Sequence, residues 1–203
     1  GKFALVNYEK SLNTDEANKD LLFSDEHIFS LRGQNVKSDA EGVHKQITGT
    51  DGNVQMASGY QSILYLGDLE DYRLNWYKSF YIIKYTSDNS ERFFPKMPMI
   101  RLSEMYLIAA EGWMEDDPEH AAELLQTLKQ ARTKSIVNKQ TVTEEMILLE
   151  MRKEFVGEGQ LFYVYKRLNH DIIGNTSEDG VKASNRVFVL PLPEEEIEYG
   201  YRN

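Results

Sequence analysis

The sequence of 203 residues carries 33 acidic and 23 basic side chains, and its formal net charge of −10 argues against binding to nucleic-acid backbones or anionic membrane surfaces. It contains no cysteine, which excludes disulfide bonds and thiolate chemistry. At this length and with 41% hydrophobic residues the chain can bury a substantial core, and no apolar run approaches the length of a transmembrane helix.

Residues 1–98 are predicted to be rich in loops and aromatic side chains. The alternation within 27–33 predicts a short strand that ends at Gly33. Residues 35–59 are polar and glycine-punctuated, and a loop of this length is uncommon unless it is functional or mobile. Residues 80–85 favour another short strand. It closes the most aromatic part of the sequence, which contains Tyr60, Tyr65, Tyr72, Trp76, Tyr77, Phe80, Tyr81 and Tyr85.

Residues 99–168 are predicted to form a helical core. Asp117 and Pro118 are suited to the N-cap and first position of a helix, and only a short turn separates that helix from the one before it. Two amphipathic helices joined in this way pack antiparallel and resemble one tetratricopeptide-like unit. The first of them is predicted from a stripe of apolar residues at helical spacing: Leu102, Met105, Tyr106, Ala109 and Trp113.

Two further helices are predicted after this pair. One begins after Thr141 or Thr143 and ends near Gly157, and a shorter one covers 161–168. Residues 169–203 are expected to be a surface loop followed by an extended, acidic tail. The predicted fold class is therefore mainly α, in a single domain over 1–203, with a tetratricopeptide-like helical core, an irregular loop-rich region and a few short strands.

Sequence motifs of catalysis are weak or absent. Neither a G-x-S-x-G element nor a phosphate-binding loop occurs, and no carboxylate pair stands out among the 33 acids. The four histidines are scattered, which disfavours zinc. The acidic stripe Glu104, Glu111 and Glu115 is interpreted as a solvated face or as ion pairs with Arg101 rather than as metal ligands. We expect no enzyme, no cofactor and no metal.

The aromatic stretch instead favours carbohydrate binding. Sugar rings present apolar C–H faces that stack on tyrosine and tryptophan, while amide and guanidinium groups hydrogen-bond to the hydroxyl groups. The alternative is that most of these aromatic side chains only cover the helical core. The candidate ligand-binding residues are Tyr60, Tyr72, Arg73, Asn75, Trp76 and Tyr77.

Four blocks occur in order: MIRLSEMYLIAAEGW at 99–113, LKQAR at 128–132, EMRKEFVGEGQLFYVYKR at 150–167 and LPLPEEEI at 190–197. Together they resemble the C-terminal part of the SusD/RagB family, and Asp71-Tyr72-Arg73 and Lys84-Tyr85 are similar to two shorter elements of that family. The chain departs from the residues usual in the family at Met151, Gly157, Leu161 and Val164, which argues against the family's buried charge network here but not against its fold.

This resemblance implies an outer-membrane lipoprotein, exposed at the cell surface, that captures an oligosaccharide or another nutrient without breaking bonds. Such proteins pass the nutrient to a SusC-like TonB-dependent transporter. The signal sequence and acylated cysteine of the family are absent from these 203 residues, so we expect the C-terminal portion of such a protein, soluble by itself. The alternatives are a helical-repeat scaffold that binds only proteins and, less favoured, a glycoside hydrolase.

Overall fold

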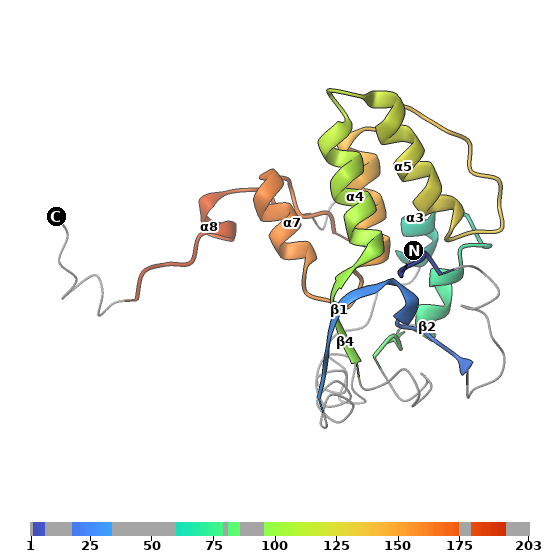
Figure 1. Cartoon of the computed structure of the whole chain (residues 1–203). Coiled ribbons are helices and arrows are strands. Elements are labelled where there is room, and N and C mark those ends of the chain that lie inside the picture. The colour runs from blue at the N-terminus through green and yellow to red at the C-terminus, as the bar shows by residue number, and fades with distance from the viewer. Residues whose placement is uncertain are drawn as a thin grey trace. The chain divides into compact units, whose positions relative to one another are not determined.

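The computed structural model describes residues 2–6, 18–33, 60–78, 81–85, 96–174 and 180–193. The chain forms two compact units, Gly1–Glu158 and Gly159–Asn203 (Figure 1). That the two units act together as one domain stays a prediction. Among the described residues helices outweigh strands, which confirms the mainly α fold class.

Two antiparallel helices dominate the first unit, as the sequence predicted. Helix α4 covers Leu102–Trp113, and α5 covers Pro118–Gln130 and lies against it (Figure 1). Asp117 is the N-cap of α5, and its side chain accepts a hydrogen bond of 3.0 Å from the backbone N–H of His120. This bond satisfies one of the free donors at the helix start.

Helix α6, Glu144–Glu154, packs against α4. Of the two threonines considered as its N-cap, Thr143 is the one that serves, because its hydroxyl accepts a hydrogen bond from the N–H of Met146. The helix ends just before Gly157, whose φ of 74° lies in the left-handed region that glycine adopts without strain.

The start and the buried face of α4 differ from the prediction. Residues 99–101 belong to strand β4, Lys96–Arg101, so the helical core predicted from residue 99 begins three residues later, at Leu102, the first residue of the predicted stripe. Its buried residues are Ser103, Leu107 and Ala110, whereas Trp113 of the predicted stripe is 45% exposed. Small side chains allow α4 to approach its neighbours closely, which leaves the larger apolar residues at the margins of the contact.

Two short antiparallel strand pairs complete the regular structure of the first unit. Strand β1, His27–Arg32, confirms the strand predicted at 27–33 and pairs with β4 through partners such as Leu31 and Met97. Strands β2, Tyr77–Lys78, and β3, Tyr81–Ile82, form the second pair. The strand predicted at 80–85 is therefore shorter than expected, and the loop predicted at 35–59 lies outside the described residues.

Short segments, rather than the long helices, supply the aromatic core of the first unit. The sequence did not predict helix α3, Tyr60–Tyr65, or the 3-10 helices η2, Ser24–Glu26, and η3, Tyr72–Trp76. Phe23 and Trp76 meet there with ring centroids 5.0 Å apart. The cluster contains Val6, Leu21, Phe23, Leu64, Tyr65, Tyr72, Trp76, Tyr77, Ile83 and Val156.

The second unit contains helix α7, Leu161–Leu168, where the sequence predicted a helix, and the short helix α8, Asn185–Phe188. The expectation of a surface loop and an extended tail over 169–203 is wrong at Asn185–Phe188, because these residues form a helix; Phe188 is buried there, and its ring lies 5.8 Å from that of Phe162. Folding this segment into a helical turn brings the two aromatic rings together.

Candidate ligand-binding site

The candidate site is built on α3, η3 and the turn between them. Helix α3 ends at Leu66 and Gly67, which both have positive φ. Asp71 then caps η3, because its carboxylate accepts a hydrogen bond of 3.0 Å from the backbone N–H of Arg73. The cap fixes the direction of η3 and turns the Arg73 side chain into the protein, where it is 1% exposed.

Four of the six candidate residues lie in the interior. Tyr72, Arg73, Trp76 and Tyr77 are buried, and the Trp76 side chain is completely enclosed. The Tyr72 hydroxyl donates a hydrogen bond of 3.1 Å to the carbonyl of Val6. These contacts favour the alternative in which the aromatic side chains form core, and direct ligand contact by these four residues stays a prediction.

The remaining two candidates are accessible. Tyr60, the first residue of α3, is half-buried, and its hydroxyl lies 3.5 Å from the guanidinium of Arg152 on α6. Asn75 is exposed, and its amide donates a hydrogen bond of 2.8 Å to the carbonyl of Tyr72. This hydrogen bond fixes the orientation of the amide group. It uses the amide nitrogen, so the side-chain oxygen of Asn75 is not engaged in it.

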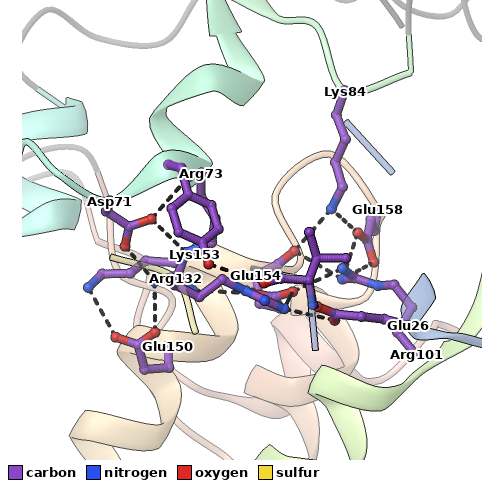
Figure 2. A network of polar contacts seen from close by, with 12 residues as sticks. Glu26, Asp71, Arg73, Lys84, Arg101, Arg132, Glu150, Lys153, Glu154 and Glu158 are labelled. Atoms are coloured by element: carbon purple, nitrogen blue, oxygen red, sulfur yellow. Dashed lines mark hydrogen bonds and ion pairs between the residues drawn. The ribbon is translucent and has the colours of Figure 1, made fainter. Parts of the chain in front are cut away.

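A network of buried charges lies beneath these segments (Figure 2). In it, five cations face five carboxylates, so the charges balance. The members come from η2, η3, β4, α6 and the connections after β3 and α5, which ties segments far apart in the sequence to one place. They are Arg73, Lys84, Arg101, Arg132 and Lys153 with Glu26, Asp71, Glu150, Glu154 and Glu158.

Glu154 is the centre of this network. One of its oxygens lies 3.0 Å from both Arg101 and Arg132, and the other lies 3.2 Å from Arg73 and 3.1 Å from Arg132. Burial alone would raise the pKa of Glu154, but the three guanidinium groups, Arg132 foremost, hold it well below its usual range. The carboxylate therefore stays ionised and forms ion pairs with three arginines at once.

Lys84 and Arg101 close the C-terminal end of α6. Both donate to the backbone carbonyl of Glu154, at 3.1 and 3.0 Å, and both pair with the carboxylate of Glu158. The Lys84 ammonium also lies 3.7 Å from the centre of the Trp76 ring. Burial, and next to it the charge of Arg101, lower the pKa of Lys84 to about 8 despite the opposing effect of Glu158.

The sequence-based expectation that the chain lacks the family's kind of buried charge network is therefore wrong. It rested on Met151, Gly157, Leu161 and Val164, but the network uses other positions. Glu150, Glu154 and Glu158 recur every fourth residue, which places the first two on the same face of α6. That spacing of acids in a helix whose last turns are buried is the signal that sequence reasoning missed.

Metal ligation finds no support in the described part of the chain, where no group of three or more His, Cys, Asp and Glu side chains is arranged to hold an ion. Of the acidic stripe on α4, Glu104 is half-buried, and burial raises its pKa while the nearby Arg101 lowers it. Arg101 forms its ion pairs with Glu154 and Glu158. In the same described residues, no helix has the length and apolar character needed to cross a membrane.

Solved structures of the same class share this architecture. A SusD superfamily protein from Bacteroides thetaiotaomicron superposes with a TM-score of 0.74 at 24% identity, covering 98% of this chain and 51% of its own. A Bacteroides vulgatus protein, named for a suggested sugar-binding role, gives 0.68 at 25% identity, with 97% and 49% covered. A SusD superfamily protein from Bacteroides fragilis gives 0.60 at 20% identity, with 87% and 44% covered.

These structures define a helical, tetratricopeptide-like fold of the SusD class, and the chain spans about half the length of each of them. The family model for the SusD family matches residues 25–198. The chain therefore belongs to the SusD family, as its four sequence blocks indicated. A search of curated protein sequences finds no match.

Proposed function

We propose that this chain is the glycan-binding component of an outer-membrane nutrient-uptake system of the SusC/SusD type, and that it binds its ligand without breaking bonds. The observation that carries the proposal is the SusD family match over residues 25–198. It is supported by the Bacteroides vulgatus neighbour, whose name suggests sugar binding, at 25% identity over 97% of this chain.

Tyr60 and Asn75 are the candidate residues suited to direct ligand contact. The half-buried Tyr60 ring offers an apolar face for stacking on a sugar ring. The Asn75 amide is exposed and held in place by its bond to Tyr72, so its oxygen can accept a hydrogen bond from a sugar hydroxyl. The buried Tyr72, Arg73, Trp76 and Tyr77 support the backbone that presents them.

Isothermal titration against a panel of oligosaccharides tests this proposal. We expect one glycan class to bind, Tyr60→Ala and Asn75→Ala to weaken that binding at least tenfold, and Ser62→Ala, an exposed position on the same helix, to leave it unchanged. Chromatography after incubation should return the glycan intact. Absence of binding to every glycan class, or release of shorter products, would refute the proposal.

The proposed partner is a SusC-like TonB-dependent transporter, with the protein at the cell surface and attached to the outer membrane by a lipid. Co-purification from membranes with such a transporter tests the partnership, and accessibility to added protease on intact cells tests the location. Recovery of the protein without any transporter would contradict the first, and full protection from protease the second.

A scaffold that binds only proteins is the second candidate, because α4 exposes two large apolar side chains. Ile108 is 51% exposed and Trp113 is 45% exposed, and single helical units of this kind bury such faces against other helices. The titration separates the two candidates, since a scaffold would bind no glycan, and its protein partner would be lost on replacing Ile108 and Trp113 by serine.

A further inference from the structure

Arg152 is buried like the arginines of the charge network but does not share their carboxylates. It lies on α6, two residues before Glu154, and is only 6% exposed. Arg73, Arg101 and Arg132 each form ion pairs with carboxylates, whereas Arg152 forms none with any residue that the structure describes. A guanidinium that has lost most of its hydration without gaining a counter-ion is costly.

The contacts of Arg152 are with Tyr60. Its guanidinium lies 3.5 Å from the Tyr60 hydroxyl and 5.8 Å from the centre of the ring. Such stacking holds the planar group in place but leaves most of its five N–H donors without an acceptor. Unlike Nη1 of Arg132, the nitrogens of Arg152 are not among the described atoms that are fully buried without a partner, so those that form no hydrogen bond keep some contact with solvent.

Two buried phenols of the first unit, those of Tyr65 and Tyr77, carry no charge at physiological pH. The hydroxyls of Tyr65 on α3 and Tyr77 on β2 are buried without a hydrogen-bond partner, and their rings lie 6.1 Å apart. Burial raises the pKa of Tyr77 to about 12 and that of Tyr65 well above its usual value. Both stay protonated at physiological pH, so neither can supply the negative charge that Arg152 lacks.

We propose that Arg152, positioned by Tyr60, binds the anionic group of an acidic oligosaccharide, either a uronic-acid carboxylate or a sulfate ester. Both groups offer paired oxygens that match the fork of the guanidinium, and charge-assisted bidentate bonds are among the strongest hydrogen bonds. The Tyr60 ring, already predicted to stack on sugar, lies beside the bound anion. This inference rests on the proposed glycan-binding function and names its ligand class.

The net negative charge of the protein does not prevent an anionic ligand from binding. The formal net charge is −10, but at physiological ionic strength charges separated by more than about 8 Å are largely screened. A guanidinium that is mostly buried is screened far less than the surface carboxylates. The short-range pairing with Arg152 therefore decides which ligand group is accepted.

Titration with matched pairs of oligosaccharides tests the inference, each acidic form being compared with its own carboxyl-reduced or desulfated form. We expect an acidic form to bind at least tenfold more tightly than its neutral counterpart. Arg152→Gln should abolish this preference. Arg186→Gln, which makes the same charge change at an exposed position on α8, should preserve it. A preference over the carboxyl-reduced form identifies a carboxylate as the bound group, and a preference over the desulfated form identifies a sulfate.

Several outcomes overturn the inference. If the protein binds neutral glycans without any preference for an acidic form, or if Arg152→Gln keeps the preference, the inference fails while the proposed function stands. If it binds no glycan at all, the proposed function fails as well. Should Arg152→Gln not fold, as judged by circular dichroism, Arg152→Lys decides: it keeps the charge but not the fork, and should reduce the preference for the acidic form about tenfold.

Discussion

The ion pairs of the charge network in the first unit differ from the Lys182–Asp171 pair of the second unit chiefly in burial. In the second unit Lys182 lies 2.6 Å from Asp171, and the two side chains are 90% and 43% exposed. In the first unit Arg132 lies 2.8 Å from Glu26 and 3.0 Å from Glu154, with all three side chains fully buried. Distance alone therefore does not show on which of these pairs the folded structure depends.

Solvation explains why. An exposed pair exchanges water for a partner at little net gain, whereas a buried charge that loses its partner can no longer recover its water. The network thus adds little compared with an apolar core of the same volume, but every member becomes indispensable once the others are present. It also joins segments from Glu26 to Glu158, so a single removal affects the whole first unit.

The largest effect is expected from removing the central carboxylate. Glu154→Gln leaves Arg73, Arg101 and Arg132 with one negative charge fewer in the interior, and should lower the free energy of unfolding by about 3–5 kcal/mol. Urea denaturation followed by circular dichroism measures the loss. Glu144→Gln, in the exposed first turn of the same helix, serves as the control and should cost at most about 0.5 kcal/mol. Equal losses in the two variants would show that burial is not the deciding property.

The pH dependence of stability tests Lys84. Its pKa of about 8 in the folded chain lies below its ordinary value of 10.5, so between these values the unfolded chain binds more protons. Stability from this group therefore rises with pH above about 8, by roughly 1 kcal/mol per pH unit. Urea titrations between pH 7.5 and 9, where tyrosine is still largely protonated, should show this rise in the native chain but not in Lys84→Met. If stability changed with pH in the same way in the native chain and in Lys84→Met, this would contradict the lowered pKa of Lys84.

A smaller effect is expected at Ser103, and any change there is a gain of stability, in contrast to the loss expected for Glu154→Gln. Its hydroxyl is buried on α4 without a hydrogen-bond partner, and alanine is the better helix former. Ser103→Ala should therefore leave stability unchanged or raise it by about 0.5–1 kcal/mol. Thermal unfolding checks this expectation. A clear loss of stability would mean that the hydroxyl has a role that its contacts do not reveal.

The smallest effect is expected at the exposed pair. Lys182→Ala removes the partner of Asp171 but leaves that carboxylate in water and still accepting a hydrogen bond of 2.8 Å from the backbone N–H of Ala183. The midpoint of urea unfolding should not move measurably. A shift comparable to that of Glu154→Gln would reverse the comparison between the two units.

The helices of this chain were largely predictable from local sequence. Asp117, Pro118 and Thr143 mark helix starts through chemistry confined to one turn, and the observed helices begin where these residues place them. The buried face of α4 was not predictable, because a stripe of large apolar residues says nothing about the partner. Ser103 and Ala110 were overlooked since small residues carry little hydrophobic signal but permit close packing.

The candidate site divides in the same way. Tyr60 and Asn75 are accessible, while Tyr72, Arg73, Trp76 and Tyr77 are buried, and no sequence pattern distinguishes these two groups. Arg152 was not a candidate at all. Arg152 can be recognised only in the structure, because what distinguishes it is burial without a carboxylate partner among the described residues.

Local patterns alone determined the mainly helical fold class, the caps of its helices and, through four ordered blocks, membership of the SusD family. Only the tertiary structure decided which charges meet at Glu154, which aromatic rings are enclosed and which buried arginine of the described residues has no carboxylate partner. The physical reason is that helix formation depends on residues within a turn of one another, whereas burial and charge pairing here depend on residues up to 106 positions apart, as Glu26 and Arg132 are.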